Sequence, residues 1–295
     1  MVPKSILPLG MLLLCAGCNL TPRYTRPKSP VPDALPASEA REGALPAEGH
    51  WQDFITHPGM RSVIQLALAN NRDLRVAALN VEKAQAAYRI RRADLLPNVG
   101  VLGNGNKYRL PEKMNGGTAT LKEQDSVNVG LMSWEIDFFG RIRSLKHTAL
   151  NQYLATEQAH RSAQIALVAT VAQGYLQCAA DRDNLQLAQS TFESQKAYYE
   201  LIAKSRELGV ASDLTLRQAQ SQMESARADV AKFRGLVAVD QNALELLAGA
   251  PVPEGLLPKN LEEAAGLKDV SAGLSSGVLL RRPDILMSEY QLKAS

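Results

Sequence analysis

The chain has 295 residues, a formal net charge of +3 and an apolar content of 45%, so two or more domains are possible, and so is one elongated domain. Charges so nearly balanced exclude the strongly basic surface that nucleic-acid partners require. Three scattered cysteines and four histidines distant from them match neither a disulfide framework nor a metal site, and no spacing of residues indicates a catalytic site.

Residues 1–17 have the layout of a lipoprotein signal peptide. One Lys precedes an apolar run that is too short for a lasting membrane span, and the run ends in the letters CAGC. This ending resembles a bacterial lipobox, although Cys15 stands where Leu is usual. We therefore expect a covalent lipid on Cys18 and no other cofactor, the alternative being an ordinary signal peptide. Asn19 follows Cys18 instead of an Asp, which favours the outer membrane as the destination.

Residues 18–50 are rich in Pro, Ala and Ser, which predicts an extended arm that runs over a surface. Residues 51–97 follow with a short amphipathic segment, 51–69, and a helix that Pro97 and Asn98 end. Apolar residues recur on this helix at steps of three and four, as on one helical face. This stripe consists of Leu74, Ala77 or Ala78, Val81, Ala84 and Tyr88.

Residues 98–139 change to a β pattern. Two strands of more than ten residues each flank a loop around Asn115, Gly116 and Gly117, which predicts a β-hairpin. The alternation is expected to continue to Phe138, with Glu135 and Asp137 sharing one face of the strand. Strands of this length, with aromatic residues such as Trp134 near an interface, suit a membrane barrel, and a soluble hairpin with one buried face is the alternative.

Residues 140–250 predict a long helical hairpin. The stretch 141–207 has no Pro and only one Gly, and at 1.5 Å per residue it forms on the order of 100 Å of helix. The helix breaks at LGVASDL, where Gly209 suits a left-handed C-cap and Ser212 or Asp213 an N-cap. The next helix carries a heptad seam that predicts coiled-coil packing, with Asp240 as its one polar member. The apolar members of this seam are Leu216, Ala219, Met223, Ala226, Val230, Phe233, Val237, Leu244 and Leu247.

The last part of the chain indicates an internal repeat. Residues 251–279 form a loop-rich connector, and residues 280–295 then open a helix at Pro283. Asp284, Ile285 and Leu292 match Asp73, Leu74 and Val81 at one constant spacing. We interpret 280–295 as the start of a second, truncated repeat.

Several stretches together resemble the TolC/OprM family of outer-membrane efflux proteins, in the NodT-like lipoprotein branch. They are CNLTPRYTRP, NRDLRVAALNVEKAQAAYR, SWEIDFFGRIRS, NQYLATEQAHRSAQIALVATVAQGYL and LLRRPDILMSE. The resemblance implies a mainly α fold with a β-hairpin: long antiparallel coiled-coil helices form part of a tunnel, and two strands contribute to a trimeric outer-membrane β-barrel. In these terms, 51–97 holds equatorial and first tunnel helices, 98–139 the transmembrane hairpin, 140–250 the periplasmic tunnel helices and 251–279 an equatorial connector.

The same resemblance implies a passive channel subunit of a tripartite efflux system, not an enzyme. Its partners would be two further copies in a homotrimer, a periplasmic adaptor (membrane fusion) protein, an inner-membrane efflux pump and outer-membrane lipid. The turn between the long helices resembles the adaptor-docking tip, which comprises Leu208, Gly209, Val210, Ala211, Ser212 and Leu214. Arg206 and Asp213 are candidates for a gate or latch, with partners expected on the missing repeat.

Two alternatives stay open from the sequence. The chain is a truncated, non-functional remnant of such a channel, or it is a periplasmic adaptor lipoprotein, which would need small β-sandwich domains flanking the helical hairpin. The cargo follows from no motif in the sequence.

Overall fold

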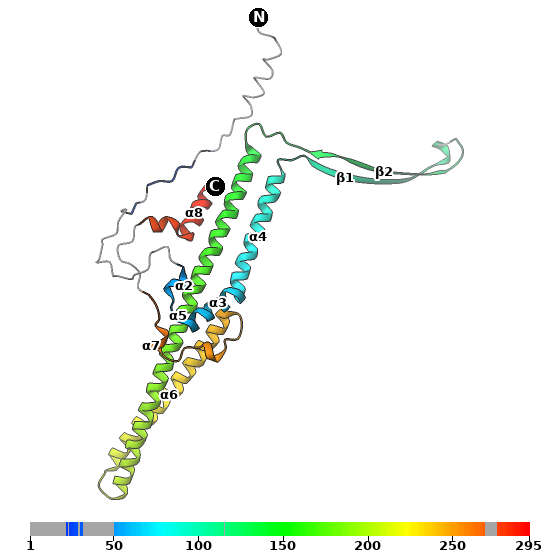
Figure 1. Cartoon of the computed structure of the whole chain (residues 1–295). Coiled ribbons are helices and arrows are strands. Elements are labelled where there is room, and N and C mark those ends of the chain that lie inside the picture. The colour runs from blue at the N-terminus through cyan, green and yellow to red at the C-terminus, as the bar shows by residue number, and fades with distance from the viewer. Residues whose placement is uncertain (1–21, 23, 29, 32–49, 115, 269–275) are drawn as a thin grey trace. The chain divides into compact units, whose positions relative to one another are not determined.

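The computed structural model describes residues 22, 24–28, 30–31, 50–114, 116–268 and 276–295. The signal segment 1–17, the lipidation site Cys18 and most of the arm 18–50 lie outside these residues. The chain divides into two units (Figure 1). One comprises Met1–Pro27, Val81–Thr156 and Ser288–Ser295, and the other comprises Lys28–Asn80 and Glu157–Met287.

The first unit contains the antiparallel strands β1 (Asn98–Leu110) and β2 (Thr120–Ser133), joined through the 3-10 helix η1 (Glu112–Met114). The two strands form a two-stranded sheet whose pairing runs from Asn98 opposite Ser133 to Leu110 opposite Thr120. Gly116 and Gly117 in the connecting loop have φ values of +68° and +100°, a conformation that glycine adopts without steric cost. The predicted hairpin is therefore confirmed, with strands of 13 and 14 residues.

The prediction that the strand continues to Phe138 is wrong, because β2 ends at Ser133. Its partner strand begins at Asn98, directly after Pro97, and a proline has no N–H with which to extend the pairing. Glu135 and Asp137 therefore share no strand face. They lie in the connection to α5, where the Phe138 N–H donates to the Ile136 carbonyl oxygen at 3.0 Å in a tight turn.

The same unit contains the later part of α4 (Arg72–Ala93), the beginning of α5 (Arg141–Glu207) and the end of α8 (Pro283–Ala294). The predicted stripe of α4 is half-buried at Val81, Ala84 and Tyr88, and the Tyr88 ring stacks on that of Tyr153 in α5 at 6.5 Å. The described part of the arm contacts α8: Arg26 pairs with Glu289, and Lys293 lies 4.7 Å from the Tyr24 ring.

The second unit contains the rest of α5 and the antiparallel α6 (Asp213–Ala248), which together form the predicted helical hairpin. The bounds of α5 are those that the absence of proline predicts. On α6 the heptad seam is the covered face: Ala219, Ala226 and Leu244 are buried, and the other seam residues, Asp240 included, are half-buried. The predicted coiled-coil packing is thus confirmed.

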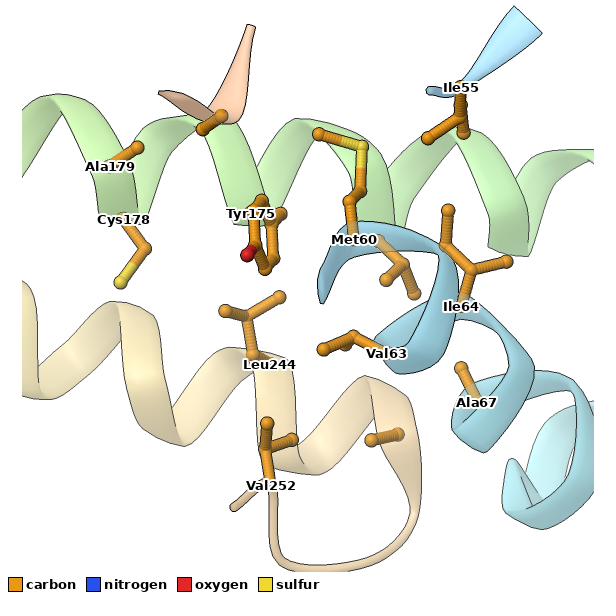
Figure 2. Close-up of a cluster of buried hydrophobic side chains, with 13 residues drawn as sticks. Ile55, Met60, Val63, Ile64, Ala67, Tyr175, Cys178, Ala179, Leu244 and Val252 are labelled. Atoms are coloured by element: carbon orange, nitrogen blue, oxygen red, sulfur yellow. The ribbon is translucent and has the colours of Figure 1, made fainter. Parts of the chain in front are cut away.

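The core of this unit lies where α2 (Trp51–Phe54) and α3 (Pro58–Asn70) pack near the base of the helical hairpin. Figure 2 shows Met60 and Ile64 of α3 directed towards α5, and Val63 of α3 directed towards Leu244 of α6. The Tyr175 hydroxyl donates to the Leu256 carbonyl oxygen at 3.0 Å, and burial raises the pKa of Tyr175 to about 12. Cys178 is fully buried beside it, as expected of a small core residue.

Three short elements follow α6: η2 (Glu254–Leu256), α7 (Leu261–Ala264) and η3 (Ser276–Arg281). The helix α8 begins at Pro283, as the sequence predicts, and Asp73 and Asp284 are each the second residue of their helices; the internal repeat stays an interpretation. Among the helices of the described residues, none combines the length and the apolar character that a membrane crossing requires.

Candidate docking tip and strand–helix junction

The tip between α5 and α6 is a capped turn built by its backbone. The Gly209 N–H donates to Arg206 O at 2.9 Å, and the Val210 N–H donates to Ser205 O at 2.9 Å. These are the two bonds of a Schellman motif, and the φ of +74° at Gly209 supplies its left-handed residue. Ser212 then caps α6, since its hydroxyl accepts the Thr215 N–H at 3.1 Å.

Capping explains the Gly and Ser of the tip but leaves its apolar residues unexplained. Leu208, Val210 and Leu214 are 80%, 82% and 68% exposed. In a Schellman motif the residue after the glycine usually contacts an apolar side chain three places before the helix end, and here that place holds Ser205. Val210 therefore has no such contact, and the tip offers a small apolar surface to another molecule.

Arg206 and Asp213 pair with one another across the tip, with Nε and Oδ1 2.6 Å apart. The hydrogen bond from Arg206 lowers the pKa of Asp213 below its ordinary value. Both charges also suit their positions, since a cation favours the last turn of α5 and an anion the first turn of α6. The structure thus supplies a partner for each residue within the chain, where the sequence suggested partners on a second repeat.

A pair of facing carboxyls on the coiled-coil seam was not recognised in the sequence. The half-buried Asp240 of α6 lies beside Asp181 of α5, which is only 6% exposed and accepts a hydrogen bond from Gln177 at 2.9 Å, whereas Asp240 Oδ2 has no hydrogen-bond partner among the described residues. Burial, followed by the interaction with the Asp181 carboxyl, raises the pKa of Asp240. The polar interruption of the seam is therefore a specific contact between the two helices.

The junction between β2 and α5 is organised by two arginine–carboxylate pairs. Arg141 binds both oxygens of Glu135, at 3.0 and 2.5 Å. Asp137 accepts hydrogen bonds from the Arg143 backbone N–H at 2.9 Å and from the Arg143 Nε at 3.3 Å. Asp137 therefore caps the start of α5 and also forms an ion pair with Arg143. Both pairs join residues six apart, a repeated spacing in SWEIDFFGRIRS that could have revealed the arrangement.

Comparison with known proteins identifies the architecture. The family model described as outer membrane efflux protein matches residues 63–250. The chain is 41% identical to the toluene efflux pump outer membrane protein TtgC of Pseudomonas putida, over 99% of this chain and 62% of the relative. It is 37% identical to the cation efflux system protein CusC of Escherichia coli, over 100% of this chain and 64% of the relative.

Solved structures agree with these relatives. A membrane protein from Pseudomonas aeruginosa superimposes with a TM-score of 0.80 at 36% identity, over 94% of this chain and 62% of that one. The open-state MtrE outer membrane channel of Neisseria gonorrhoeae gives a TM-score of 0.76 at 31% identity, over 94% of this chain and 61% of that one. The chain thus spans a little under two thirds of the length of each of these relatives, and it belongs to the outer membrane efflux protein family.

Proposed function

We propose that this chain supplies part of a channel subunit in the outer membrane and acts as a passive conduit for solutes that an inner-membrane pump drives. In this role the chain is a conduit and not an enzyme. It holds open a path for drugs or other small toxic solutes. Its relatives in Pseudomonas putida and Escherichia coli carry names of this kind, an efflux pump outer membrane protein and a cation efflux system protein.

The observation that carries the proposal is the exposed character of the β1–β2 pair. Within the described residues each strand pairs only with the other, so both outer edges of the sheet retain unpaired backbone groups. Val99, Val101, Val127, Val129 and Leu131 are all more than 60% exposed. Two strands are marginal in water by themselves, and lipid tolerates only a sheet that closes on itself. Such a pair is therefore suited to a sheet shared among several copies.

The proposed partners follow from two features, the β1–β2 strand pair and the tip between α5 and α6. A homotrimer completes the sheet in the outer membrane and surrounds the tunnel with helices. A periplasmic adaptor docks on the apolar tip at Leu208, Val210 and Leu214, and connects it to the inner-membrane pump. A lipid on Cys18, outside the described residues, adds a membrane anchor. The match of residues 63–250 to the outer membrane efflux protein family supports this role over that of an adaptor lipoprotein.

The proposal is tested by complementation of a strain whose own efflux channel has been deleted. The gene restores resistance to a pump substrate if the product conducts, and the channel protein is recovered from the outer membrane as a trimer. Val210→Glu places a charge on the tip and weakens adaptor binding by about five- to tenfold, as loss of an interface anchor does. The matched control, Gln222→Glu, adds the same charge at an exposed position of α6 away from the tip.

Resistance that returns with Val210→Glu as fully as with the unaltered gene would exclude the tip as the adaptor site. A product that remains monomeric in the membrane and restores no resistance would overturn the channel proposal itself.

A further inference from the structure

The length of the strands places the junction of β2 and α5 at a particular depth in the membrane. A strand of 13 residues, at about 3.3 Å per residue and a tilt of about 40°, rises by roughly 33 Å. The apolar band of outer-membrane sheets is about 25 Å tall. The strand end that continues into the helices α4 and α5 therefore reaches the headgroup layer. This step rests on the proposed function.

The ends of β1 and β2 that lead into α4 and α5 belong to the first unit (Figure 1), and the sequence there is rich in apolar residues. Trp134 is 56% exposed and Phe139 is 73% exposed, and Leu96, Ile136 and Phe138 are exposed to a similar degree. Tryptophan favours the interface between lipid and water, because its ring is apolar and its N–H can meet a polar group. The residues next to the strands therefore have the composition of a surface that contacts lipid at headgroup depth.

Two arginines beside this surface retain a charge that no carboxylate of the described residues neutralises. Arg91, Arg141 and Arg143 pair with Asp94, Glu135 and Asp137 in turn. Arg89 and Arg92 lie three residues apart on α4, both exposed, and form no ion pair within the described part of the chain. Together with Leu95 and Leu96 they line a cavity of about 470 Å³.

We propose that Arg89 and Arg92 bind the phosphate of an anionic phospholipid, whose acyl chains lie against Leu96 and Trp134. The charge selects the occupant, since a basic pair over an apolar floor complements a phosphodiester headgroup attached to hydrocarbon. The positive charges of the arginines also interact favourably with the negative end of the helix dipole at the C-terminus of α4. This role stabilises the helix and implies no preference among lipids. Lipid preference therefore separates the two roles.

Trp134 provides a direct probe, because the chain has only two tryptophans. Trp51→Phe leaves Trp134 as the single fluorophore. The full chain in mixed micelles is titrated with phosphatidylglycerol that carries bromine on its acyl chains, and separately with brominated phosphatidylcholine. Quenching of Trp134 at lower concentrations of phosphatidylglycerol, with a preference that declines as salt is added, is the expected result.

In the same background, Arg89→Gln with Arg92→Gln lowers the apparent affinity for phosphatidylglycerol by about fivefold for each charge removed. The matched control is Arg72→Gln with Arg75→Gln, which removes two exposed charges with the same spacing from the first turn of the same helix. Arg89→Lys with Arg92→Lys restores the preference, and far-ultraviolet circular dichroism verifies that each variant is folded.

Three results would overturn the proposal: equal quenching by both lipids, equal losses in the Arg72/Arg75 control, or a Trp134 that neither lipid quenches because another copy covers it. The oligomeric state, measured on the same samples, keeps this test apart from that of the channel. A monomer that prefers phosphatidylglycerol supports the lipid site alone, and a trimer without any preference supports the channel alone.

Discussion

Asp240 illustrates how a single residue can interrupt an apolar seam and still belong to it. Its partner, Asp181, is buried on α5 and already accepts a hydrogen bond from Gln177, so the two carboxyls share a site with little water. The other ionisable groups that face this site are Cys178 and Arg182, both on α5. Two carboxylates in such a place cannot both remain charged without cost, and a shared proton removes that cost.

The raised pKa of Asp240 predicts a pH-dependent stability of the helical hairpin. The folded state holds a proton on this pair at pH values where the unfolded chain has lost it. Stability therefore falls as the pH rises from the ordinary pKa of an Asp through the raised one. Asp240→Asn removes this slope and stabilises the hairpin by on the order of 1 kcal/mol above that range, because the amide donates to Asp181 without needing a proton.

Thermal unfolding followed by circular dichroism between pH 4 and 8 measures the effect. The control, Asp229→Asn, replaces an exposed carboxylate of the same helix. Parallel pH profiles for the unaltered chain and Asp240→Asn would contradict the shared proton.

At the scale of the element, the α5–α6 hairpin depends on small residues that let the two helices approach. Ala219 and Ala226 are 1% and 6% exposed, whereas larger seam residues such as Met223 and Phe233 remain half-buried. Where alanine lies between the two helices, the helix axes can come close together. The small side chain then fixes the distance between the axes more strictly than leucine would.

Ala226→Leu is expected to destabilise the hairpin by about 1–3 kcal/mol, because the larger side chain has no space between the helices. Ala228→Leu, at an exposed position of the same helix, is expected to change stability by only a few tenths of a kcal/mol. Denaturant titrations of the two variants give both values, and a similar loss in each would show that Ala226 is not a point of close approach.

The elements themselves could largely be predicted from the sequence, and the pairings between them could not. The bounds of α5 follow from local features, since no proline interrupts it and Gly209 ends it. The end of β2 at Ser133 was missed because Pro97, on the other strand, decides it. The contacts of Asp240 with Asp181 and of Arg206 with Asp213 join different helices, and no local spacing within one helix indicates them.

At the scale of the whole molecule, the described residues leave many large apolar side chains and both outer edges of the strand pair exposed. Exposed large apolar residues occur along β1, β2, α5, α6 and the tip. The chain also spans a little under two thirds of each relative compared, and three of these relatives are outer membrane or efflux proteins by name. Assembly is therefore expected to decide how much of this surface remains accessible.

Hydrogen exchange measured by mass spectrometry tests this expectation. Amides of 98–133 are expected to exchange rapidly in the monomer, because outer-edge N–H groups lack partners and two strands are marginally stable. In the assembled state the same segment gains protection, while the core segment around Tyr175 is slow in both states. Full protection of 98–133 in the isolated monomer would show that the strand pair needs no neighbours.

The open edges of the β1–β2 pair also constrain how the cell can make this protein. A newly synthesised copy crosses the periplasm with a ready template for pairing with any other extended chain, and it is prone to aggregate on the way. Any factor that covers these edges before assembly is therefore expected to raise the yield of folded protein. The rate of productive biogenesis would then be set by how quickly the subunits find one another.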